Sequence, residues 1–164
     1  MKVIFLDLDG VLNSERSFLA AAPIDPMEPS YHEYLTQRTI DPVAVGLLNR
    51  LALQLDARIV ISSTHRKHFE RSADPLAEMQ AYFGQLGVDA ARIIGATPSL
   101  HKERGHEIQH WLDRQPWVTD YVILDDSTDM LLSQLDHFVR VDGLVGLTAA
   151  NYYQASSILG GAAE

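Results

Sequence analysis

A short apolar run near the start of the chain, Val3–Leu6, ends abruptly in Asp7-Leu8-Asp9-Gly10. An uninterrupted apolar run of this length is typical of a strand buried on both faces of a parallel sheet. The two carboxylates then emerge at the carboxyl edge of the sheet, where open α/β folds bind their ligands. Because neighbouring acids repel each other, a divalent cation is the simplest reason for them to coexist.

Apolar runs alternate with segments of helical periodicity along the rest of the chain, and this alternation is typical of a parallel α/β sheet. The expected strands are residues 2–7, 58–61, 92–95, 121–124 and 137–141, and the expected helices are 41–55, 75–84, 103–114 and 148–159. The sequence therefore predicts a doubly wound, Rossmann-like parallel sheet of about five strands with helices on both faces. Asp41-Pro42 and Thr148 are expected helix starts.

The length of 164 residues favours a single domain over residues 1–164. Residues 13–39 break the alternating pattern and contain Pro23, Pro26 and Pro29. We expect this segment to form a small, irregular, cap-like insert that follows the first strand and lies over its end.

Composition limits the possible partners and compartment. The formal net charge of −9 argues against tight binding to duplex nucleic acid, which depends on Lys and Arg contacts to phosphates. It leaves room for a small phosphorylated substrate. No segment approaches the roughly 20 apolar residues that span a bilayer, and the first apolar run is too short for the core of a signal peptide. With no cysteine in the chain, we expect a cytoplasmic protein without membrane contact.

Three of the expected strands end in oxygen-bearing side chains. If the strands are parallel, these side chains share one edge of the sheet, which is hard to attribute to chance or to helix capping alone. The three groups are Asp7 with Asp9, then Ser62 with Ser63 and Thr64, and finally Asp125 with Asp126.

These residue types suit phosphoryl transfer. Carboxylate oxygens are the ligands that Mg²⁺ prefers, and a carboxylate can also act as a nucleophile that forms an aspartyl phosphate. A second carboxylate can protonate the leaving group and then activate water, while hydroxyl groups bind phosphoryl oxygens. A cation must also stabilise the transferred charge, and the candidates are Lys102 and Arg104.

At these residues the sequence resembles the haloacid dehalogenase (HAD) superfamily of phosphohydrolases. Asp7-Leu8-Asp9-Gly10-Val11-Leu12 resembles its first motif, DxDGxh, and Ser62 stands where the second motif has Ser or Thr. Lys102 or Arg104 corresponds to the basic residue of the third motif, and Asp125-Asp126 resembles the DD form of the fourth. The resemblance covers about residues 2–159.

A narrower resemblance exists to the small HAD domains associated with RNA-repair proteins and phage genomes. It rests on VISSTHR, on Arg104-Gly105 with the helix that follows, on YVILDD and on the late Gly146-Leu147-Thr148. Members often read SSxWR where this chain has His65 before Arg66, so the chain departs from the pattern at the aromatic position.

The resemblance implies a role for each matching residue. Asp7 is the nucleophile and a Mg²⁺ ligand, and Asp9 is the general acid and base, with its backbone carbonyl on the metal. Asp125 is a further ligand, with Asp126 on the metal directly or through water. Ser62, together with Ser63, binds the phosphoryl group.

The basic residue is left open between two positions, because Arg104-Gly105 matches the family's basic-Gly pair whereas Lys102 matches the usual residue type. Arg66, in the basic patch after the second strand, is a further candidate for phosphate binding. Dehalogenases of the superfamily generally lack the second aspartate, so Asp9 favours phosphoryl transfer over carbon–halogen cleavage. The predicted activity is Mg²⁺-dependent hydrolysis of a phosphate monoester, and an open site permits a nucleotide or a nucleic-acid end.

Two alternatives come from other functional classes. The segment His106-Glu107-Ile108-Gln109-His110 matches HExxH, a zinc-protease pattern. The chain offers essentially no downstream Glu as a third ligand, since only the terminal Glu164 follows His110. The second alternative is a non-catalytic HAD-like module for binding or regulation, against which the intact Asp7, Asp9 and Asp125 set speaks.

Overall fold

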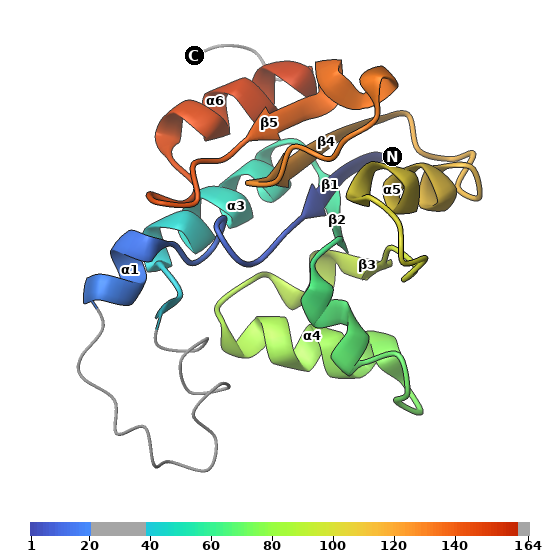
Figure 1. The fold of residues 1–164 in the computed structure, drawn as a ribbon, viewed down its shortest axis with the longest axis horizontal. Helices are drawn as coiled ribbons and strands as arrows, with labels where there is room; N and C mark the ends of the chain where they lie inside the picture. The colour runs from blue at the N-terminus through green and yellow to red at the C-terminus, as the bar shows by residue number, and fades with distance from the viewer. Residues whose placement is uncertain (21–38, 161–164) are drawn as a thin grey trace.

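The computed structural model describes residues 1–20 and 39–160, which form a five-stranded parallel sheet in the order β3-β2-β1-β4-β5 (Figure 1). Each expected strand and helix is present, with bounds within two residues of those predicted. The strands are β1 (Lys2–Leu6), β2 (Ala57–Ile61), β3 (Ile93–Ala96), β4 (Asp120–Asp125) and β5 (Phe138–Arg140).

The order of the strands makes the sheet doubly wound. The chain begins in the centre with β1, adds β2 and β3 on one side, and then crosses to the other side for β4 and β5. The order therefore reverses between β1 and β4, and the carboxyl ends of strands at such a switch point are where open α/β sheets bind ligands. The chain places Asp7 and Asp125 at these two strand ends.

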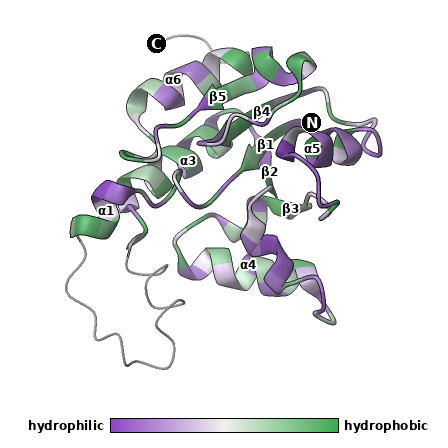
Figure 2. Ribbon diagram, in the orientation of Figure 1, coloured by the Kyte–Doolittle hydropathy of each residue, from purple (hydrophilic) through white to green (hydrophobic). Residues whose placement is uncertain are grey.

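Helices cover both faces of the sheet, which confirms the predicted architecture. The larger core lies under α3 (Pro42–Gln54), α4 (Pro75–Gln85) and α6 (Ala149–Ile158) and includes Leu6. The smaller core lies under α5 (Arg104–Leu112), where Ile108 packs against Phe5 and its neighbours. Each strand thus supplies both faces with apolar side chains, as expected for a buried parallel strand. Figure 2 shows β1 and β2 coloured as hydrophobic and residues Thr64–His68 after β2 as hydrophilic.

The predicted helix starts are confirmed in detail. Asp41 accepts a hydrogen bond from the backbone N–H of Val43 at 2.8 Å, with Pro42 in the first turn of α3. Thr148 accepts one from the backbone N–H of Asn151 at 3.3 Å at the start of α6. Short 3₁₀ helices, which the pattern did not predict, lie at Thr64–His68, Ala90–Arg92 and Leu132–His137.

The expected insert over residues 13–39 is described only at its two ends, since residues 21–38 lie outside the described part of the chain. The first end is not irregular as expected, because Glu15–Ala20 forms the short helix α1. Asn13 and Ile40 form an isolated antiparallel bridge. The segment thus begins and ends at one place, beside the end of β1, and its role as a cap stays a prediction. No helix in the described ranges is both long and apolar enough to cross a membrane.

Candidate active site

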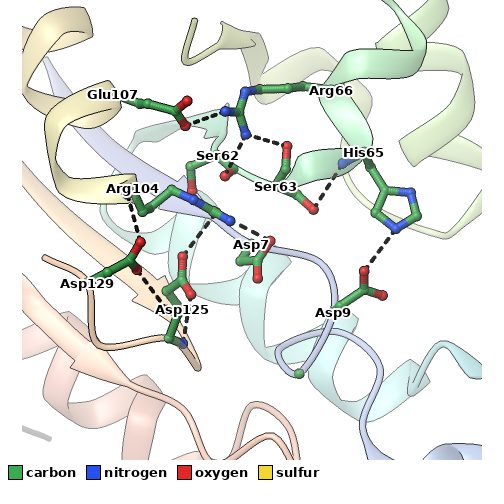
Figure 3. A network of polar contacts seen from close by, with 12 residues as sticks. Asp7, Asp9, Ser62, Ser63, His65, Arg66, Arg104, Glu107, Asp125 and Asp129 are labelled. Carbon is green, nitrogen blue, oxygen red and sulfur yellow. Dashed lines mark hydrogen bonds and ion pairs between the residues drawn. The ribbon is translucent and has the colours of Figure 1, made fainter. Parts of the chain in front are cut away.

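The ends of β2, β1 and β4 bring Ser62, Asp7 and Asp125 side by side at the carboxyl edge of the sheet (Figure 3). The backbone N–H of Asp7 donates to the carbonyl of Leu124 at 3.0 Å, and that of Ser62 donates to the carbonyl of Leu6 at 2.9 Å. The sheet pairing thus continues through these positions. Side chains alternate along a strand, so all three point toward the face that α5 covers.

Carboxylate oxygens of Asp7, Asp125 and Asp126 lie within 4.8 Å of one another, close enough to share one cation. Asp126 fits between two glycines. A Cβ on Gly10 would lie 2.4 Å from the Asp126 Oδ2 atom, and one on Gly143 would lie 2.8 Å from it. Gly10 also has a φ of +78°, which favours glycine. The two glycines therefore let the Asp126 carboxylate approach the backbone on both sides.

Arg104 is the basic residue that the structure brings to this cluster. Its Nη1 atom lies 3.0 Å from Oδ2 of Asp125 and 3.4 Å from Oδ1 of Asp7, so it bridges the two carboxylates. Lys102, the other candidate, is exposed and lies in the loop that precedes α5. Of the two candidates, the structure brings Arg104 to the acidic cluster and leaves Lys102 exposed.

The first turn of α5 holds Arg104 in place through Asp129. The Asp129 carboxylate accepts from the backbone N–H of Arg104 at 2.9 Å, and its carbonyl accepts from that of Gly105 at 3.1 Å. Burial alone raises the pKa of Asp129, but the backbone N–H of Arg104 and the Ser127 hydroxyl lower it below its usual value. A Cβ on Gly105 would lie 2.5 Å from the backbone nitrogen of Leu131, so this close packing requires glycine.

Burial shifts the two central carboxyl groups toward their neutral forms. It raises the pKa of Asp7, against the lowering effects of Arg104 and the Ser63 hydroxyl. For Asp125, burial and the nearby negative charge of Asp7 raise the pKa to about 7. Two buried acids with raised pKa values and one shared arginine form a site that a further cation would stabilise.

The two serines at the end of β2 differ in what they contact. The Oγ atom of Ser62 is buried and has no hydrogen-bond partner among the described residues, and the same holds for Oγ1 of Thr97. The Ser63 hydroxyl accepts from the backbone N–H of His65 at 3.4 Å, at the start of the 3₁₀ helix. A buried hydroxyl without a partner is costly, so Ser62 is available to a ligand oxygen at the edge of the sheet.

The structure commits Arg66 to contacts within the protein, and the phosphate-binding role expected for it stays a prediction. Its side chain is buried, forms an ion pair with Glu107, and donates to the carbonyls of Ser62 and Ser63 at 3.1 and 2.7 Å. Glu107 in turn accepts from the backbone N–H of Leu100 at 2.9 Å. The pair therefore ties the end of β2 to α5.

The ion pair with Arg66 gives the glutamate of the HExxH segment a structural role. In a zinc protease the glutamate of that pattern acts as a general base, whereas Glu107 is paired with Arg66 inside the protein. His106 is exposed and lies 3.8 Å from the carboxylate of Glu103. In the described ranges, the cluster of possible metal ligands is Asp7, Asp125 and Asp126 rather than these histidines.

The side chain of Asp9 lies outside the acidic cluster. Its carboxylate accepts from the Asn13 amide at 2.8 Å and lies 3.1 Å from Nε2 of His65. Figure 3 shows it turned away from Asp7 and toward His65. The Asp9 side chain is 59% exposed, so burial does not fix this position. The departure from the family pattern at His65 thus places an imidazole beside the expected general acid.

A cleft of about 960 Å³ opens onto this edge of the sheet. Asp7, Asp9, Asp126 and Arg104 line it, together with residues that the sequence patterns did not single out. These further residues come chiefly from α1 and from the end of β5, and include Glu15, Arg140, Asp142 and Leu144. Arg140 and Glu107 carried no sequence signal of function, because one is a single charge in an edge strand and the other fell within a decoy motif.

The parallel sheet and the acidic cluster at its switch point are the features of a HAD-type domain. A family model described as the HAD domain in Swiss Army Knife RNA repair proteins matches residues 3–152. The chain belongs to this family, which confirms both the broad and the narrower resemblance seen in its motifs. Neither the comparison with curated proteins nor that with solved structures finds a match.

Proposed function

We propose that this protein hydrolyses phosphate monoesters, with Mg²⁺ as cofactor and Asp7 as the nucleophile that forms an aspartyl phosphate. Membership of a HAD-type family supports phosphatase chemistry in general terms. The observation that carries the specific proposal is the arrangement around Asp7. A shared arginine, two further carboxylates and a partnerless buried hydroxyl surround this one carboxylate.

The carboxylate cluster fits a magnesium ion. Asp7, Asp125 and Asp126 offer only hard oxygen ligands. Burial and neighbouring carboxylates raise the pKa of Asp7 and of Asp125, an effect that a bound cation would oppose. These three residues would hold the ion, with the backbone carbonyl of Asp9 as a further ligand. When bound, Mg²⁺ would keep the carboxylates ionised and offset the negative charge of the phosphoryl group.

The protein's own residues carry out the nucleophilic attack, the proton transfers and the binding of the phosphoryl group. A carboxylate oxygen of Asp7 attacks phosphorus, and the bond from phosphorus to the leaving oxygen breaks. Asp9 gives its proton to that oxygen, and then takes a proton from the water that attacks the phosphoryl group. Inorganic phosphate leaves and the Asp7 carboxylate is restored. Arg104 and the Ser62 hydroxyl bind phosphoryl oxygens as their charge develops.

Asp9 must turn from its observed position to reach the leaving group. Its carboxylate is exposed and contacts Asn13 and His65, and Asp9 itself lines the cleft. We propose that substrate binding brings this side chain toward the leaving oxygen. A proton donor that is poorly aligned in the ligand-free state is common among general acids and bases.

The substrate is proposed to be a nucleotide or a nucleic-acid end. Support comes from the family to which the chain belongs, whose description refers to RNA repair proteins, and from the cleft of about 960 Å³ beside Asp7. The net charge of −9 opposes tight binding of a long duplex. A phosphate at the end of a chain needs only the local positive charge that Arg104 and Mg²⁺ would supply.

Phosphate release from a panel of substrates tests the proposal. The panel contains p-nitrophenyl phosphate, nucleoside monophosphates, 3′-phosphorylated oligonucleotides and sugar phosphates, each with Mg²⁺ or with EDTA. We expect Mg²⁺-dependent release that Asp7→Asn abolishes and that Asp136→Asn leaves intact, since Asp136 is exposed and outside the cleft.

The outcomes separate the alternatives. Turnover of sugar phosphates alone would overturn the nucleic-acid substrate class but leave the phosphatase standing. No release from any substrate, combined with biological activity that survives Asp7→Asn, would favour the non-catalytic HAD-like module.

A further inference from the structure

Arg140 lies on the strand next to Asp125, at the same edge of the sheet as Asp7, Ser62 and Asp125. Arg140 on β5 is the register partner of Asp125, the last residue of β4, which in turn lies beside Asp7 at the end of β1. Neighbouring strands lie about 4.8 Å apart, so the Cα atoms of Arg140 and Asp7 are roughly 10 Å apart. Arg140 is exposed and lines the cleft, which places its guanidinium group in the same open space as the nucleophile.

The guanidinium group of Arg140 has no hydrogen bond or ion pair with any described residue, and only its backbone carbonyl is engaged, by the Asn151 amide. Arg104, the other arginine of the cleft, is already bound to Asp7 and Asp125. Arg140 is therefore the one uncommitted cation among the described residues that line the cleft.

Acidic side chains line the same cleft, but none of the described ones forms an ion pair with Arg140. The Asp142 carboxylate accepts from the backbone N–H of Leu144 at 2.9 Å, where it stabilises a turn, and Asp126 belongs to the metal cluster. An arginine binds phosphate through two parallel N–H groups, and such charge-assisted bonds are among the strongest polar contacts. A second phosphate group of the substrate is the ligand that this chemistry fits.

We propose that Arg140 binds a second phosphate group of the substrate, next to the phosphate that is hydrolysed at Asp7. The inference rests on the proposed function and narrows its substrate class to molecules that carry at least two phosphates, such as a nucleoside bisphosphate or the 3′ end of an oligonucleotide. Asp7 and Arg140 lie roughly two strand spacings apart, and two adjacent phosphates of one nucleotide chain can reach both residues at this separation.

The test compares adenosine 3′-monophosphate with adenosine 3′,5′-bisphosphate as substrates. The wild-type protein should show a higher kcat/KM for the bisphosphate. Arg140→Ala should lower the ratio of the two kcat/KM values about tenfold, as expected for the loss of one charge-assisted contact. Arg140→Lys should keep part of the preference. Arg50→Ala, which removes an exposed arginine outside the cleft, should leave the ratio unchanged.

Binding measured without turnover separates this inference from the proposed function. In the Asp7→Asn protein, calorimetry should give a lower Kd for the bisphosphate than for the monophosphate, and adding Arg140→Ala should remove most of that difference. An unchanged ratio after Arg140→Ala, or no binding of the bisphosphate, would overturn the role of Arg140. If the wild-type protein releases no phosphate, the proposed function fails, and the binding ratio still decides the role of Arg140.

Discussion

Asp125 is expected to destabilise the metal-free protein above neutral pH. Burial and the charge of Asp7 raise its pKa from 3.8 to about 7. At about 1.36 kcal/mol per pKa unit, this difference is worth up to about 4 kcal/mol. Because the folded state holds the proton more tightly than the unfolded chain, the free energy of unfolding should fall as pH rises from about 4 to about 7 and then level off.

Asp125→Asn removes this titration while keeping an oxygen that can accept from the backbone N–H of Ser127, as Asp125 does at 2.9 Å. Loss of the charged contact to Arg104 opposes the resulting gain in stability at high pH, but the raised pKa shows that burial and the charge of Asp7 outweigh it. We therefore compare the variant with the wild type at pH 5 and at pH 8. The free energy of unfolding of Asp125→Asn, relative to that of the wild type, should be higher at pH 8 than at pH 5 by about 2 to 4 kcal/mol.

Urea denaturation in EDTA measures this difference, with Asp136→Asn as the exposed control that should show none. Excess Mg²⁺ at pH 8 should then stabilise the wild type much more than Asp125→Asn, because the ion binds the ionised cluster of the folded state. An equal effect of Asp125→Asn at both pH values, or a less favourable one at pH 8, would refute the electrostatic reasoning.

Three further substitutions and one control variant test how the site is held together. Arg104→Ala should lower kcat about 100-fold or more, as loss of a group that stabilises developing charge does, whereas the exposed Lys102→Ala should change kcat less than about twofold; steady-state kinetics on p-nitrophenyl phosphate compares them. Arg66→Ala should cost about 3 to 5 kcal/mol in urea denaturation because it leaves Glu107 buried without its partner, and a cost below about 1 kcal/mol would contradict the structural role. Gly105→Ala should displace the first turn of α5 and lower kcat, since its Cβ would lie 2.5 Å from a backbone nitrogen; an unchanged kcat would show that this packing is not needed.

The features that the sequence predicted are those with a local physical cause. Apolar runs such as Val3–Leu6 are buried on both faces, so the strands and their polar ends can be located without any long-range information. Parallel pairing then brings Asp7, Ser62 and Asp125 to one edge. The choice of Arg104 needed more than its residue type, since the contact with Asp129 sets where α5 begins.

The features that the sequence did not predict depend on contacts between distant segments. Arg66 pairs with Glu107, and nothing local distinguishes a buried arginine from one that faces a substrate. The orientation of Asp9 depends on His65, which lies 56 positions away in the chain. Helix α1 is only six residues long and has no buried residue, so its hydrophobic pattern is too weak to predict it.

Detection of the aspartyl phosphate tests the central claim most directly. The wild-type protein is mixed with substrate and Mg²⁺, quenched in acid within one turnover, digested, and analysed by mass spectrometry. We expect the peptide that contains Asp7 to carry one phosphoryl group in the wild type and none in Asp7→Asn, which should also lose turnover. Phosphate release by the wild type without a phosphorylated Asp7 peptide, together with turnover that survives in Asp7→Asn, would contradict the account.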